Sequence, residues 1–257
     1  MIETDVRLDI AGGVARITVT RASRMNAMRD QTADDLLAAL ITAEADASVG
    51  AVLLTGEGRA FGAGYDLSTI DPTEAPDLAR VLEVHFNPLI RRMRASRLPI
   101  VAAVNGACAG ASVGIALAAD IVIAAENAFF YEPFVGIALV PDAGNTLFLP
   151  RMAGRIRASA AMLLGDRITA TEAERWGLVW RVVAPDALLP EAERVCAALA
   201  ARSRDAVAMT KRLIAQASDP DLDNGLDLER DLQGKAGRSP ELRAEIDRFF
   251  AARAAKT

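Results

Sequence analysis

The chain has 257 residues, 52% of them apolar, and its 29 Lys and Arg against 34 Asp and Glu leave a formal charge of −5. This composition excludes a disordered chain, and the length suits one large domain or one domain with a small helical appendage. The mildly acidic balance, without a cluster of basic and aromatic residues, argues against nucleic acid as a partner.

Cysteine and histidine are too scarce for a zinc site, which needs three or four such ligands, so we expect no metal. Two cysteines and an N-terminus unlike a signal peptide favour a cytoplasmic protein. The uncharged stretch 98–119 is long enough to cross a bilayer, but Pro, Asn and Gly interrupt it. We therefore interpret it as a strand, a turn and a helix, and expect no contact with a membrane.

Hydrophobic periodicity predicts most elements of the first half. Alternation on both sides of Gly12-Gly13 predicts a β-hairpin over 6–19. Helical spacing predicts helices at 33–41 and 78–94, and a Gly/Ala-rich one from about Gly110. Short continuous apolar runs predict buried parallel strands at 51–54, 100–104 and 121–124. The alternation of strand and helix predicts the α/β class.

The pattern changes after Pro150. A capping box from Thr169 to Glu172 predicts a short helix that ends at Gly177, and a strand follows over 178–183. From about residue 186 the pattern is helical to the end, with Ser239-Pro240 as a helix start. We therefore predict an α/β core over 1–185 and a C-terminal helical region over 186–257 that packs on a neighbour or on its own core.

Two glycine motifs point to other classes of enzyme but lack the necessary context. Residues 110–114 match GxSxG, yet the only histidine, His85, precedes Ser112, whereas a hydrolase of that type places its histidine last. We interpret His85 as a half-buried packing residue and the GxSxG segment as a close-packed helix. Gly56-Glu57-Gly58 lacks the third glycine of a dinucleotide site.

Two Gly/Ala-rich loops, 59–67 and 105–111, each follow a predicted buried strand. Such loops can bring backbone N–H groups close to a ligand, and two convergent N–H groups form an oxyanion hole. The same spacing also suits two tight turns that need glycine for a positive φ. From spacing alone, both interpretations stay open.

These loops resemble the two oxyanion-hole motifs of the crotonase superfamily, the enoyl-CoA hydratases and isomerases, written approximately AFxAGxDL and NGxAxGxG. The similarity continues through 118–124, 140–144 and 149–151. Segments 87–92, 176–180 and 226–231 resemble the 1,2-epoxyphenylacetyl-CoA isomerase branch in order and spacing. The resemblance therefore covers nearly the whole chain.

The resemblance implies a crotonase-like spiral of ββα units with a C-terminal helical trimerisation region, in trimers that pair into hexamers. The thioester carbonyl of an acyl-CoA substrate would lie between the N–H groups of Tyr65 and Ala111. Ala111 stands where many relatives have glycine, so this hole requires a negative φ there. No cofactor is implied, because coenzyme A is part of the substrate. The candidate substrate-binding residues are Arg24, Ala63, Gly64, Asp66, Leu67, Gly110 and Phe134.

The resemblance also bears on the acid/base groups. Relatives that hydrate a double bond use two glutamates, where this chain has Gly114 and Phe134. Glu132 would point elsewhere on a strand. Asp142 matches the acidic position of the isomerase branch, although an aspartate after Pro141 also suits a turn or a helix cap. Apolar surroundings could raise its pKa toward neutrality.

We therefore expect an acyl-CoA isomerase that stabilises a thioester enolate, with Asp142 as the acid/base. The substrate would be 1,2-epoxyphenylacetyl-CoA or an enoyl-CoA whose double bond migrates. The alternatives are an enoyl-CoA hydratase with relocated acids and a catalytically idle CoA-binding protein. Arg21, Arg24, Arg59 and a neighbour's Lys256 are candidates for contacts with the CoA diphosphate.

Overall fold

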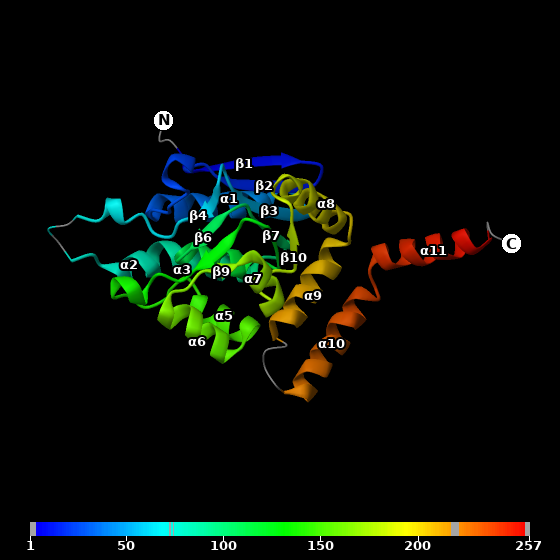
Figure 1. Ribbon diagram of the computed structural model, residues 1–257. Coiled ribbons are helices and arrows are strands. Elements are labelled where there is room, and N and C mark those ends of the chain that lie inside the picture. Colours follow the sequence, from blue (N-terminus) through cyan, green and yellow to red (C-terminus); the bar gives the residue numbers. More distant parts are fainter. Residues whose placement is uncertain (1–3, 72, 74, 217–220, 255–257) are drawn as a thin grey trace. The chain divides into compact units, whose positions relative to one another are not determined.

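The computed structural model describes residues 4–71, 73, 75–216 and 221–254 (Figure 1). The chain divides into two compact units, Met1–Ala201 and Arg202–Thr257. The first unit contains both sheets, and the second consists of helices.

A six-stranded sheet forms the centre of the first unit, in the order β1-β2-β3-β5-β7-β10. Its strands are β1 (Val6–Ala11), β2 (Val14–Val19), β3 (Ala51–Gly56), β5 (Ile100–Val104), β7 (Ile121–Ala125) and β10 (Arg181–Val183). The predicted hairpin is confirmed, since β1 and β2 pair antiparallel around Gly12 and Gly13, which have φ of 58° and 79°. From β2 onward all neighbours are parallel, as the apolar runs predict.

A second, four-stranded sheet has the order β4-β6-β8-β9. Its strands are β4 (Ala60–Gly62), β6 (Ala107–Ala109), β8 (Phe129–Tyr131) and β9 (Ile168–Thr169). The chain passes repeatedly from a strand of the first sheet to one of the second: β3 to β4, β5 to β6, and β7 to β8. This alternation winds the chain as a spiral of ββα units. The second-sheet strands are too short to show a periodicity, so the sequence does not predict them.

The first unit contains the helices α1 (Asp30–Ala45), α2 (Leu78–Val81), α3 (Asn87–Ala95), α4 (Ala111–Ala118), α5 (Asn145–Ala153), α6 (Arg155–Leu164), α7 (Ala170–Trp176) and α8 (Leu188–Ala200). Of these, α1 packs on β1 and β2, and α8 packs on β3 and β5 of the larger sheet. The expected helix over 78–94 contains one π-helical turn, η3 (Leu82–Phe86), between α2 and α3. Pro88 follows this turn, and its missing N–H cannot continue a regular helical ladder.

Two hydrophobic clusters cover the two faces of this sheet. The larger one includes α1, α3 and α4, and the smaller one packs Leu188, Ala192 and Cys196 of α8 on Leu53 and Val101. Because α8 buries its apolar face here, it belongs to the first unit. The observed division therefore follows α8, whereas the boundary expected at 185/186 precedes it.

The second unit contains α9 (Arg204–Gln216), α10 (Leu222–Ala236) and α11 (Pro240–Ala254). Ser239 begins the last helix as predicted, since its Oγ accepts a hydrogen bond from the Leu242 N–H at 3.2 Å. Several large apolar side chains of this unit are exposed, among them Leu222, Leu226, Phe249 and Phe250. The helical C-terminal region is thus confirmed.

Other local predictions hold with small corrections. Thr169 and Glu172 form the predicted capping box of α7, which ends at Gly177. The strand expected over 178–183 is shorter, because only Arg181–Val183 pairs with β7. The uncharged stretch 98–119 contains the predicted strand β5 and helix α4, but the segment interpreted as a turn also contains the short strand β6. No helix among the described residues has the length and hydropathy to cross a bilayer.

Candidate active site

A cavity of about 440 Å³ opens beside the two glycine-rich loops. This volume is typical of sites for small molecules. Its wall is mostly apolar and comes from the loop after β4, the segment 76–86, the loop between β6 and α4, and the chain after β8. The lining residues are Ala63, Gly64, Tyr65, Leu67, Ile70, Pro76, Leu78, Val81, Leu82, Phe86, Ala109, Gly110, Ala111, Tyr131, Pro133, Phe134, Ile137, Leu139 and Asp142.

The two loops meet backbone to backbone at Gly64 and Gly110, which have φ of 89° and 55°. A Cβ added to Gly110 would lie 3.5 Å from the Gly64 Cα, and one added to Gly64 would lie 3.2 Å from the Ala109 oxygen. The Gly64 N–H also donates to Ser112 Oγ of α4 at 3.3 Å. The positive φ favours glycine at both positions, and at Gly64 the close approach of the Ala109 oxygen also leaves little room for a side chain.

The N–H of Tyr65 points toward the cavity. Met28 forms a parallel bridge with this segment: its N–H donates to the Gly64 oxygen at 2.7 Å, and its oxygen accepts from the Asp66 N–H at 2.7 Å. Backbone groups alternate in direction along an extended segment, so the Tyr65 N–H faces the opposite side, where the cavity lies.

The N–H of Ala111 is the second donor at this wall. Ala111 is the first residue of α4, so its N–H has no acceptor within the helix. The φ of Ala111 is not positive, so alanine can replace the glycine of many relatives without backbone strain. Among the described residues, neither this N–H nor that of Tyr65 donates to another protein group. Two unsatisfied N–H groups and a helix N-terminus thus border one cavity.

Asp142 lies on the cavity wall and does not cap α5. That helix has Gly144 as its N-cap and no side-chain cap, and the Asn145 N–H donates to the backbone carbonyl oxygen of Asp142 at 2.9 Å. Asp142 Oδ1 is buried with no hydrogen-bond partner in the described part of the chain. Burial raises the pKa of this carboxyl to about 6. The structure therefore favours the acid/base interpretation of Asp142 over the cap.

Glu132 is a second buried carboxyl close to Asp142. Tyr131 and Pro133 line the cavity, so Glu132 between them faces the interior. Its side chain is 1% exposed, and neither carboxyl oxygen has a hydrogen-bond partner among the described residues. Burial, and next the charge of Asp142, raise the pKa of Glu132 to about 8. The Glu132 side chain points away from the cavity wall, as the sequence predicts. Nothing in the sequence indicates that its carboxyl group is buried without a hydrogen-bond partner among the described residues.

Gly114 and Phe134 stand where relatives that hydrate a double bond have glutamates, and neither residue can act as an acid. A Cβ on Gly114 would lie 2.2 Å from the Ala143 oxygen, so α4 packs too closely there for any side chain. Phe134 instead adds an aromatic wall to the cavity. Among the described residues that line the cavity, Asp142 is the only carboxylic acid.

Residues 9–256 match the sequence profile described as enoyl-CoA hydratase/isomerase. The chain belongs to the enoyl-CoA hydratase/isomerase family. A 1,2-epoxyphenylacetyl-CoA isomerase of Escherichia coli K12 is 41% identical over 244 residues, which cover 94% of this chain and 93% of that protein. A probable enoyl-CoA hydratase of Rhodobacter capsulatus is 42% identical over 247 residues, covering 95% and 94%.

Solved structures of the family agree with the architecture. The crystal structure of an enoyl-CoA hydratase from a Polaromonas species superposes with a TM-score of 0.89 at 31% identity, covering 96% of this chain and 97% of that one. The crotonase fold expected from the motifs is therefore confirmed. The relatives' names include both isomerase and hydratase, so membership of the family leaves the reaction open.

Most family-based site candidates come together at the cavity. The wall contains all three expected catalytic residues, Tyr65, Ala111 and Asp142. It also contains five of the expected substrate-binding residues: Ala63, Gly64, Leu67, Gly110 and Phe134.

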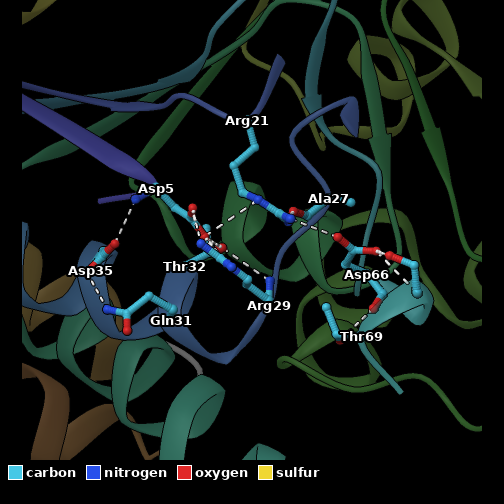
Figure 2. Close-up of polar contacts among 10 residues, drawn as sticks. Asp5, Arg21, Ala27, Arg29, Gln31, Thr32, Asp35, Asp66 and Thr69 are labelled. Atoms are coloured by element: carbon cyan, nitrogen blue, oxygen red, sulfur yellow. Dashed lines mark hydrogen bonds and ion pairs between the residues drawn. The ribbon is translucent and has the colours of Figure 1, made fainter. Parts of the chain in front are cut away.

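Asp66 and Arg21 instead hold the loops from outside the cavity wall (Figure 2). The Asp66 carboxylate accepts from Ser68 Oγ at 2.6 Å and from Arg21 Nη2 at 2.8 Å. Hydrogen bonds from Ser68, and next from Arg21, hold the Asp66 pKa below its usual value. Arg21 also pairs with Asp5 at 3.6 Å, and its side chain is 14% exposed. These two residues therefore anchor the first loop and do not line the cavity.

Among the described residues, the other basic side chains expected to contact the substrate do not line the cavity. Arg24 is exposed and is not part of the cavity wall, in contrast to the expectation that it binds substrate. Arg59 is also exposed, with its Nε 2.9 Å from Met25 Sδ. Lys256 lies outside the described residues.

His85 and Ser112 do not form a nucleophile and base pair. His85 Nδ1 lies 2.9 Å from Asp34 Oδ1, whereas Ser112 Oγ binds the Gly64 N–H. Ser112 is fully buried and neither residue lines the cavity, so the structure does not support the serine hydrolase alternative. No group of three or more potential metal ligands occurs among the described residues.

Replacement of Glu132 by Gln is expected to change how stability depends on pH. Because the folded pKa of about 8 lies above the ordinary 4.5, the folded protein retains a proton that the unfolded chain loses between these values. Wild-type stability should therefore fall as pH rises from about 4.5 to 8, and Glu132→Gln should remove this loss. The variant should gain on the order of 1 to 5 kcal/mol relative to wild type between pH 5 and pH 8.5.

Thermal or urea unfolding at both pH values measures this difference, with exposed Glu126→Gln as the matched control. A gain in Glu132→Gln no larger than that of the control would show that the Glu132 carboxyl is not isolated from water.

Proposed function

We propose that this protein is an acyl-CoA isomerase that works through a thioester enolate. In this reaction the thioester oxygen binds between the N–H groups of Tyr65 and Ala111, and Asp142 removes a proton from one carbon and returns it to another. The observation that supports the proposal most directly is the lone carboxyl of Asp142 beside two unsatisfied N–H groups in one apolar cavity.

Each group has a defined task. Removal of a proton next to the thioester, or further along a conjugated chain, leaves negative charge on the thioester oxygen. Two fixed N–H donors stabilise this charge more than the neutral carbonyl, and loss of one such donor typically costs 10²- to 10³-fold in rate. A carboxyl whose pKa is about 6 is ionised at neutral pH and remains basic enough to accept a proton.

The arrangement favours isomerisation over hydration. Hydration by paired carboxylates needs an acid and a base at the cavity, and here Gly114 and Phe134 occupy both positions. Glu132 faces the interior and does not replace either of them. A single base that returns the proton it removed is sufficient for an isomerase.

The cavity wall suits an apolar acyl group. Phe86, Phe134 and Leu139 contribute to it, together with the rings of Tyr65 and Tyr131. Similarity to a 1,2-epoxyphenylacetyl-CoA isomerase makes an aromatic acyl group or its epoxide the first substrate to test. Coenzyme A enters as part of the substrate, and we propose no other cofactor.

Assembly into trimers or hexamers is part of the same proposal. The exposed apolar side chains of the second unit, including Leu226 and Phe250, are 52% and 62% exposed in the single chain. Burial of such side chains against other subunits would remove an unfavourable contact with water.

Three CoA esters separate the possible activities: 1,2-epoxyphenylacetyl-CoA, a 3-enoyl-CoA and crotonyl-CoA. An isomerase converts one of the first two without adding water. Hydration of crotonyl-CoA without any migration of a double bond would contradict the proposal. If no ester reacts, stabilisation by about 2.7 kcal/mol at an acyl-CoA concentration of 100 times Kd would identify a binding protein.

Asp142→Asn should lower kcat by on the order of 10² to 10⁴, because an amide cannot accept the substrate proton. Acyl-CoA should still raise the melting temperature of the variant, since the N–H groups remain. Glu126→Gln, at an exposed position, serves as the control. A loss below threefold in Asp142→Asn would rule out this residue as the base.

The dependence of kcat/KM on pH should follow the ionisation of Asp142. Its pKa is raised to about 6, so the basic form predominates above that value and disappears below it. We expect kcat/KM to rise with pH through about 6, as measured in steady-state assays from pH 5 to pH 8. A value of kcat/KM that does not rise with pH near 6 would contradict the role of Asp142 as the base.

A further inference from the structure

Asn145, the first residue of α5, links the turn that carries Asp142 to the second oxyanion loop. Its side chain is fully buried, and its Nδ2 donates to the Gly110 oxygen at 3.0 Å. Its backbone N–H donates to the backbone carbonyl oxygen of Asp142 at 2.9 Å. One buried residue thus contacts the backbone on both sides of the proposed reaction centre.

The bond from Asn145 acts on the peptide unit that presents the Ala111 N–H. A trans peptide is planar, and its C=O and N–H point in opposite directions. The Gly110 oxygen and the Ala111 N–H are the two ends of this single unit. A donor that holds the oxygen from behind therefore also directs the N–H forward, into the cavity.

The first oxyanion peptide is held in the same manner. The Gly64 oxygen accepts the Met28 N–H at 2.7 Å, and the other end of that peptide is the Tyr65 N–H. Both peptide units of the proposed hole therefore have their carbonyl groups bonded on the side away from the cavity. Met28 donates through its backbone, as does Val113 to the Gly110 oxygen, whereas Asn145 donates through a side chain, which a substitution can remove without altering the backbone donors.

Gly110 has a permissive backbone conformation, and its oxygen also accepts the Val113 N–H of the first turn of α4 at 2.9 Å. Its backbone angles, φ 55° and ψ −129°, lie in a region where glycine is permissive. A peptide next to such a residue can rotate with little steric cost and turn its N–H away from the cavity. The hydrogen bond from Asn145 adds to the one from Val113 in opposing this rotation, and it also polarises the N–H as a donor.

We propose that Asn145 is a positioning residue, which holds the Gly110–Ala111 peptide with its N–H directed at the thioester oxygen. The proposal rests on the function proposed above, because it assigns that oxygen to the Ala111 N–H. It adds a residue that touches neither substrate nor the reacting atoms and acts only through the backbone.

Two variants of Asn145 test the proposal. Asn145→Ala removes the donor, and Asn145→Asp keeps the shape but places an acceptor against the Gly110 oxygen. Both should lower kcat by on the order of 10- to 10³-fold, since one oxyanion donor is lost or misdirected, while KM changes by less than about threefold. An unchanged kcat in a folded variant would overturn the proposal.

The absorption spectrum of bound cinnamoyl-CoA provides a readout that loss of stability alone would not move. Hydrogen bonds to the thioester oxygen of this conjugated ester draw electron density toward it and shift the absorption maximum to longer wavelength. The shift should be present in wild type and reduced in both Asn145 variants. A full shift in either variant would contradict the proposal even if the other fails to fold.

Asn26→Ala is the matched control. Asn26 is also fully buried, and its Nδ2 donates to the Ala60 and Glu57 oxygens at 2.6 Å and 2.9 Å, neither of which belongs to the hole. This variant should lose stability and keep the spectral shift. Absence of the shift in wild type, together with absence of isomerase activity, would refute the proposed function itself, whereas a shift in wild type that survives in Asn145→Ala refutes only the role of Asn145.

Discussion

The site depends on two backbone N–H groups at the edge of an apolar cavity, for which the described part of the chain supplies no acceptor. Each N–H belongs to a peptide unit whose carbonyl oxygen accepts a hydrogen bond on the opposite side. The donor is Met28 in the first peptide, and Asn145 together with Val113 in the second. These hydrogen bonds keep the two N–H groups in place before a ligand arrives, so little reorganisation is needed when charge develops. In the proposed reaction, the remaining features of the site would position a substrate and a base relative to this pair.

Burial acts differently on the two carboxyl groups beside the hole. Asp142 faces the cavity and Glu132 the interior, and the loss of hydration raises both pKa values, to about 6 and about 8. Between these values the pair holds one negative charge, on Asp142, the residue that lines the cavity. An uncompensated buried acid reduces stability at neutral pH, which is a cost commonly found at functional sites.

Close packing of small residues brings these groups together. Gly114 of α4 lies against the Ala143 backbone, which places the start of α4 next to the turn that carries Asp142. Ser112, from the same helix, binds the first loop through the Gly64 N–H. The same packing that aligns the oxyanion loops therefore leaves no room for a glutamate on α4, so the geometry restricts the reactions available to this member of the family.

The sequence alone determined the elements whose signals are local. Apolar runs predicted the parallel strands, Gly12-Gly13 the hairpin, and Thr169 with Glu172 the start of α7, while the motifs of both loops indicated the family and the resemblance to its isomerase branch indicated Asp142. Only the tertiary structure decided that Arg21 and Asp66 pair with each other, that α8 belongs to the core, and that Asn145 reaches Gly110. It also revealed the isolation of Glu132. Periodicity reports which face of an element is apolar, whereas the partner of a buried polar atom depends on segments far apart in the chain, which only the folded backbone brings into contact.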